Sequence, residues 1–136
     1  MVKREGTKLV VVDTPPNTAE ATIEAARCAD LVLLPVAADI NDLETLPAMH
    51  NVLTLAGSPR AFVVITRAPV QGPYEAETRK AVQGMGFEVC PVVWHQRRAF
   101  PNAQAGGVAV TEYEPEGKAA EESRALFKFT IKLLNS

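Results

Sequence analysis

The sequence lacks a phosphate-binding loop of the form G-x-x-x-x-G-K-S/T anywhere in its 136 residues. Its Gly-Lys pair, Gly117-Lys118, is followed by Ala119 and has Glu112 where the leading glycine of such a loop belongs. The chain also has no G-x-G-x-x-G following an apolar run and no G-x-S-x-G. These absences leave a phosphate loop, a dinucleotide site and a nucleophile-elbow hydrolase without support in this sequence.

Cysteine, excess charge and long apolar runs are scarce as well. Cys28 and Cys90 stand apart without a C-x-x-C or a Cys/His cluster, which argues against zinc, and we expect small buried thiols rather than a disulfide. The net charge of −2 means that any DNA contact needs a local cationic patch. No run approaches the roughly 18 apolar residues that cross a bilayer, and no signal-type segment follows the N-terminus. We therefore expect a cytoplasmic protein without a membrane partner.

Four apolar runs have the composition of parallel strands buried on both faces. They are Leu9–Val12, Leu31–Val36, Ala61–Ile65 and Phe87–Val93. Pro91 interrupts the fourth run, and because proline has no N–H to give to a ladder, this run should lie at an edge or carry a bulge.

Helical patterns alternate with these runs. They cover Thr18–Ala29, Asn41–Leu55, Tyr74–Val82 and Lys118–Leu134, and a loop with a short helix is expected over 96–107. Pro47 should end or kink the second helix in its first turn. The alternation predicts one α/β domain over residues 1–136, with a mostly parallel sheet and helices on both faces.

The clearest chemical candidate is Asp13, which directly follows the first apolar run and precedes Thr14 and Pro15. Ligands of open α/β sheets bind at the carboxyl ends of the strands, and a carboxylate there suits Mg²⁺, directly or through water. The alternative is that Asp13 only caps the helix or turn that follows.

Arginines follow the third and fourth runs. Thr66-Arg67 and Arg97-Arg98 would reach the same edge of the sheet as Asp13, where arginine can stack on a base or clamp a phosphate. Each could equally be a surface ion-pair residue. His95 has no accompanying nucleophile motif, so we expect a structural role for it.

The terminal helical pattern carries Arg124, Lys128 and Lys132 on one stripe by their i, i+4 spacing. The stripe fits either a solvated cationic face or a weak contact with the DNA backbone. The opposite side, which includes Leu126 and Phe127, is expected to pack on the sheet.

With these segments placed, their order resembles the ParA-type partition ATPases, the deviant Walker A group that includes MinD-like proteins. The segments VVVDTPP, ADLVLLPVAADINDLETL, FVVITRA, QRRAFPNAQAGGVAVTE and KAAEESRALFKFTIKLL are similar to ordered segments of that family. The resemblance implies DNA segregation, with ATP and Mg²⁺ as cofactors and Asp42 as the aspartate of the second segment. The nucleotide-binding residues that it implies are Asp13, Thr14, Pro15, Thr66, Arg67 and Arg97. The implied partners are a second copy or a ParA-like subunit, a centromere-binding adaptor protein, and non-specific DNA.

The family places its K-G-G-x-G-K-S/T loop, with a strand and a helix, before the VVVDTPP segment. The resemblance therefore implies a P-loop-NTPase-like sheet without that strand and helix, equivalent to the C-terminal two thirds of the family fold. Such a form should have no ATPase activity of its own, so its assignment as an enzyme stays open.

Two alternatives stay beside that expectation. The first is a non-catalytic module that binds a full-length ParA-like partner. The second is a response-regulator-like domain, which needs an acidic pair near the first strand where only Asp13 stands. If the family's strand order carries over, the facing edges of Leu9–Val12 and Leu31–Val36 are exposed. We expect self-association to follow, with residues 1–8 exchanged between chains.

Overall fold

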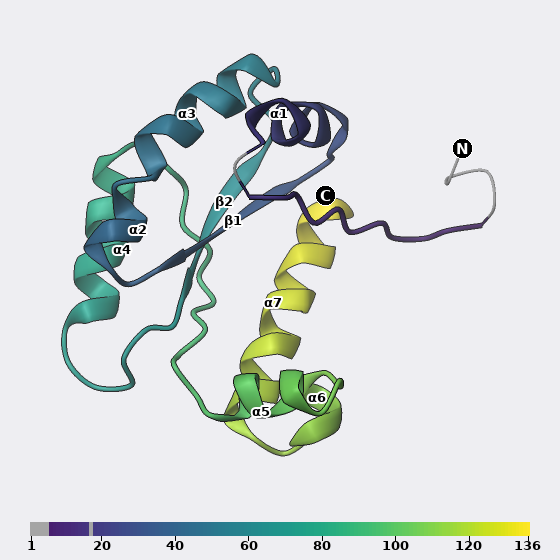
Figure 1. The fold of residues 1–136 in the computed structure, drawn as a ribbon, viewed down its shortest axis with the longest axis vertical. Coiled ribbons are helices and arrows are strands. Elements are labelled where there is room, and N and C mark those ends of the chain that lie inside the picture. Colours follow the sequence, from purple (N-terminus) through teal and green to yellow (C-terminus); the bar gives the residue numbers. More distant parts are fainter. Residues whose placement is uncertain (1–5, 17) are drawn as a thin grey trace.

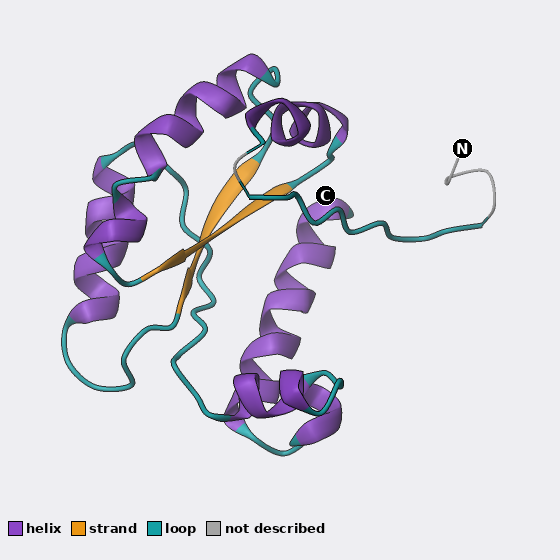
Figure 2. Ribbon diagram, in the orientation of Figure 1, coloured by secondary structure: helices purple, strands orange, loops and turns teal. Residues whose placement is uncertain are grey.

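The computed structural model describes residues 6–16 and 18–136 (Figure 1). Figure 2 shows helices and loops surrounding a small pair of strands. The elements are α1 (Ala19–Cys28), β1 (Val32–Ala37), α2 (Ile40–Leu43), α3 (Leu46–Leu55), β2 (Ala61–Thr66), α4 (Tyr74–Gly84), α5 (Ala99–Ala105), α6 (Val110–Tyr113) and α7 (Lys118–Leu134).

The sheet consists of β1 and β2, which pair in parallel from Val32 opposite Ala61 to Ala37 opposite Thr66. A parallel pair needs a crossover connection, and α2 with α3 provides it. The α/β class predicted from the sequence is therefore confirmed, as are the second and third predicted strands to within a residue.

The prediction of a strand at Leu9–Val12 is wrong. These residues are outside any strand and are exposed, with Val11 84% accessible to solvent. An apolar run becomes a strand only where a neighbouring strand accepts its backbone bonds, and no described residue does so here. Of the residues 1–8 expected to exchange between chains, residues 1–5 lie outside the described part.

The prediction of a full strand at Phe87–Val93 is also wrong, although part of this segment lies beside β2 and bonds to it. The segment makes one isolated parallel bridge, Val63 with Val89, and a second, Ala68 with His95, lies just beyond it. The Val63 N–H donates to the Glu88 carbonyl at 2.8 Å and the Val63 carbonyl accepts from Cys90 at 2.8 Å. Pro91 comes next, and hydrogen bonding to β2 resumes only at Trp94, whose N–H donates to the Ile65 carbonyl at 2.9 Å, so the ladder is interrupted around the proline, as a bulge requires.

Proline also shapes the second predicted helix. The pattern over Asn41–Leu55 divides into α2 and α3, and Pro47 lies in the first turn of α3, where its missing N–H has no cost. The prediction that Pro47 ends or kinks the helix is confirmed. The terminal helix spans Lys118–Leu134 as predicted, whereas α6 was not predicted.

Helices cover both faces of the strands. Figure 1 shows α3 and α4 on one side and α7 on the other. The main core joins β1 and β2 to α3 and α4 through Leu34, Val36, Leu46, Leu53, Val63, Val82 and Phe87. On the α7 side, Phe62 meets Phe129 edge to face at a centroid distance of 5.4 Å.

The two cysteines differ in their surroundings. Both are free thiols, as predicted, but only Cys90 is buried, and the prediction that Cys28 is buried is wrong. Cys28 is the last residue of α1, on its solvent side. Among the residues that the structure describes, no helix has the length and apolar character to cross a membrane.

Candidate functional site

The carboxyl end of β1 is organised by Asp42. Its Oδ2 atom accepts a hydrogen bond from the Ala37 N–H at 2.8 Å, so the carboxylate closes the last turn of chain after the strand. Asp39 begins α2 by accepting from the Asn41 N–H at 2.7 Å, which is the usual role of an N-cap aspartate. The aspartate that the resemblance singled out therefore lies at the strand end where α/β sheets bind ligands.

Arg67 lies beside it, directly after β2. One guanidinium nitrogen of Arg67 is 3.8 Å from Asp42 Oδ2, and the Arg67 side chain is 71% exposed. Its backbone has φ +48°, a left-handed conformation that costs a non-glycine residue about 1–2 kcal/mol. Such strain is found most often at functional positions. Asp42 and Arg67 are thus brought together, and the arginine keeps most of its surface free to meet a ligand.

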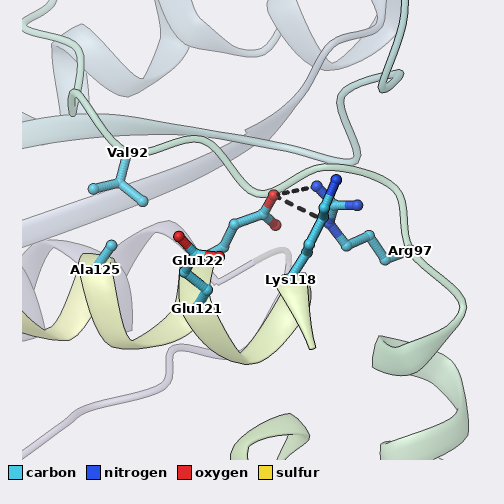
Figure 3. A pocket seen from close by; sticks show the side chains of 6 residues that line it. All are labelled: Val92, Arg97, Lys118, Glu121, Glu122 and Ala125. Carbon is cyan, nitrogen blue, oxygen red and sulfur yellow. Dashed lines mark hydrogen bonds and ion pairs between the residues drawn. The ribbon is translucent and has the colours of Figure 1, made fainter. Parts of the chain in front are cut away.

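Arg97 is used differently from the prediction that groups it with a nucleotide. Its Nε and NH2 groups donate to Glu122 Oε1 at 3.1 and 2.7 Å, and the Glu122 side chain is 14% exposed (Figure 3). His95 adds two contacts to the same carboxylate, from its N–H at 3.1 Å and from Nδ1 at 2.7 Å. Four polar contacts therefore converge on Glu122 and fix α7 to the segment after Val93.

These contacts set the protonation of Glu122. Burial by itself raises the pKa of this carboxyl, but the hydrogen bonds from Arg97 and His95 outweigh burial and hold the pKa below its ordinary value of 4.5. On the far side of the ring, His95 Nε2 is 3.4 Å from Glu75 of α4. The imidazole thus lies between two carboxylates, in the structural role that the sequence predicted.

A hollow of about 360 Å³ lies beside this cluster, between α7 and the part of the chain that carries Val92 and Arg97. Its walls are Val92, Arg97, Lys118, Glu121, Glu122 and Ala125, as Figure 3 shows. The two cations and two carboxylates among these residues balance in charge. The lining of the hollow therefore carries no net charge that would select an anion or a cation.

The residues proposed to hold a nucleotide do not form one site among the described residues. Asp13, Thr14 and Pro15 lie in the extended segment before α1, and Asp13 makes no hydrogen bond or ion pair with a described residue. The backbone carbonyl of Thr66, at the end of β2, accepts a hydrogen bond from the Ala38 N–H. The described residues hold no group of three metal-ligating side chains. No step involving ATP or Mg²⁺ is derived from this arrangement, and those roles stay predictions.

The cationic stripe of α7 is present as predicted. Arg124, Lys128 and Lys132 are exposed, and none of them forms an ion pair with a described residue. Arg124 donates to the Pro115 carbonyl at 2.8 Å, which anchors one end of the stripe. Phe127, expected on the buried side, is instead 58% exposed and borders the same surface. The aromatic of α7 that packs on the sheet is the half-buried Phe129, which meets Phe62 of β2.

Comparison with known proteins returned no match, either to a family model or to a curated protein.

Sequence reasoning missed Glu122, the centre of the most connected polar cluster. The available signal was weak: a glutamate in the first turns of an amphipathic helix is ordinarily read as a solvated residue. Its i, i+4 spacing to Leu126, which was expected to pack on the sheet, puts Glu122 on the inner side of α7. That placement, together with Arg97 and Arg98 after the fourth run, could have predicted an ion pair between this segment and Glu122.

Proposed function

We propose that this chain is a ParA-like partition protein that contributes to DNA segregation by binding rather than by hydrolysing ATP itself. The observation that carries the proposal is the exposed stripe of Arg124, Lys128 and Lys132 on one side of α7. Partition requires contact with DNA, and lysines and arginines that are free of acidic partners are the groups that neutralise phosphates.

The carboxyl edge of the strands gives secondary support. Asp42 and the strained Arg67 meet where open α/β sheets place their ligand sites, and the resemblance expects the nucleotide base near that arginine. A P-loop-NTPase-like sheet, the finer fold assignment, belongs to this proposal because the two observed strands define only its parallel α/β character.

DNA binding is measured with a fluorescent duplex of arbitrary sequence, by anisotropy at a series of salt concentrations. Three phosphate contacts give a slope of log affinity against log salt of about −2.7, so binding should be weak and steeply salt-dependent. Lys128→Glu removes one contact and adds a like charge, and it should flatten that slope by about one unit. Lys80→Glu, at an exposed lysine of α4, is the matched control and should leave the slope unchanged.

Two results would overturn the DNA contact. One is no binding even at the lowest salt concentration. The other is an equal loss in Lys80→Glu and Lys128→Glu, since equal losses reflect total charge rather than a defined stripe.

Catalysis is assigned to none of these residues because the sequence has no G-x-x-x-x-G-K-S/T loop, whose backbone N–H groups and lysine would hold the β- and γ-phosphates. The purified 136-residue chain should therefore show no ATP turnover above background. Turnover that disappears in Asp13→Ala would contradict this part of the proposal and would reveal a substitute phosphate site.

A further inference from the structure

β1 has one edge paired to β2 and one edge open. The N–H groups of Val32 and Ala38 both donate toward β2, to the carbonyls of Arg60 and Thr66 at 2.9 and 3.3 Å. Because backbone groups alternate along a strand, the odd-numbered residues direct theirs to the other edge. No strand among residues 6–16 and 18–136 pairs there.

Only the first half of that edge is available for pairing. Pro35 has no N–H, and the Ala37 N–H and carbonyl are already bonded, to Asp42 and to the Asp39 N–H at 2.8 Å each. The N–H and carbonyl of Leu33 and the carbonyl of Pro35 are bonded to no residue within 6–16 and 18–136. The open edge can therefore pair with a short strand. It offers mainly carbonyl groups, which need N–H donors from that strand.

Leu9–Val12 has the matching properties. It is extended, all four residues carry an N–H, and none is hydrogen-bonded to a described residue. Each of its side chains is at least 40% exposed, although Leu and Val in sequence are typical of a fully buried strand. Pro15 and Pro16 follow shortly after and would stop a ladder, so this segment is as short as the edge that it would cover.

We propose that Leu9–Val12 of one chain pairs with the open β1 edge of a second copy of the chain, and that the second copy returns the same contact. The chain itself carries both complementary parts, so a closed pair with twofold symmetry satisfies both without another component. Figure 1 shows the segment leading from the start of α1 away from the two strands, in a direction suited to reaching another molecule. This inference does not depend on DNA binding or on the partition role.

The first measurement is the mass of the chain in solution by sedimentation velocity over a broad concentration range. The expected result is a species of twice 14.7 kDa that dissociates on dilution. Val11→Asp should weaken dimerisation by at least about tenfold, because it places a charge in an apolar strand pair. Val70→Asp, at another exposed valine, should leave it unchanged.

The second measurement locates the contact. A photo-reactive residue replaces Val11 in a chain labelled with nitrogen-15, and this chain is mixed with an unlabelled wild-type chain. Cross-links that join one labelled and one unlabelled peptide, with the unlabelled peptide containing residues 32–37, are expected.

Three results would overturn the proposal. The first is a monomer at every concentration, and the second is equal dimerisation of Val11→Asp and wild type. The third is cross-linking confined to a single chain, which would show that the segment closes on its own β1 edge. Circular dichroism of Val11→Asp establishes that the variant is folded, which its solvent-exposed position predicts.

Discussion

Asp42 Oδ2 accepts the Ala37 N–H at 2.8 Å, so a side chain five residues later satisfies the last backbone N–H of β1. The same oxygen faces the Arg67 guanidinium at 3.8 Å. One carboxylate therefore contacts both the end of β1 and the cation that directly follows β2.

Asp42→Ala should lower the free energy of unfolding by about 1–3 kcal/mol because the Ala37 N–H loses its partner in a part-buried position. Urea denaturation followed by circular dichroism measures the change. Glu44→Ala, two residues away and exposed without a side-chain hydrogen bond, should stay within about 0.5 kcal/mol of wild type. Equal effects of the two substitutions would mean that the Asp42 bond contributes nothing to stability.

Arg67→Gly should be more stable than Arg67→Ala by about 1 kcal/mol, since glycine adopts φ +48° without a Cβ clash and alanine keeps that clash. The lost ion pair with Asp42 is exposed and common to both variants, so it cancels in the comparison. Thermal unfolding of the two proteins gives the difference. A more stable alanine variant would show that the left-handed conformation is not retained in solution.

Glu122→Gln should destabilise the protein by about 2–3 kcal/mol at neutral pH, because the hydrogen bonds from Arg97 and His95 lose their charged acceptor. The folded-state pKa of Glu122 is depressed, so its contribution is present above the ordinary value of 4.5 and is lost as the pH falls through the folded-state value. The difference between variant and wild type should therefore shrink below about pH 4.5.

Denaturation curves of both proteins at several pH values test this dependence. Glu121→Gln is the control, because Glu121 is exposed on α7 and makes no side-chain hydrogen bond to a described residue. A gap between Glu122→Gln and wild type that stays constant into acid would exclude the carboxylate as its source.

Thiol labelling should separate the two cysteines. Cys28 is exposed and should react quickly with an aromatic disulfide reagent. Cys90 should react only on unfolding, because burial excludes the reagent and raises the pKa of the thiol, although a backbone hydrogen bond at Val92 and the charge of Arg79 act against the rise. In Cys28→Ser the fast phase should disappear; fast labelling that persists there would mean that the chain around Cys90 opens readily.

Predictions from the sequence were correct for features that depend on the local pattern. They failed where the structure of a segment depends on a neighbouring strand. Proline acts within its own turn, so both the division of the second helix at Pro47 and the broken ladder at Pro91 could be anticipated. Leu9–Val12 has the same strand composition as β1, yet strand formation depends on a partner that composition does not specify.

The same limit applies to the candidate site. Arg67 was expected at the carboxyl edge of the sheet and lies there, because it directly follows β2, and Asp42, which only the resemblance singled out, lies beside it. Arg97 also follows an apolar run, but the carboxylate that binds it comes from α7, 25 residues later. Tertiary packing decides that Arg97 is bound by a part-buried carboxylate while Arg67 stays largely exposed. The local sequence around each arginine does not indicate this difference.

Trp94 is the single tryptophan of the chain, and it lies where three separate parts of the fold meet. Its indole stacks on Phe100 of α5 at a centroid distance of 5.0 Å, and its Nε1 donates to the Glu122 carbonyl of α7 at 3.3 Å. Its neighbour His95 bridges to α4 through Glu75. The protein thus has a built-in optical probe: the emission of one indole follows the attachment of α7 directly, without any added label.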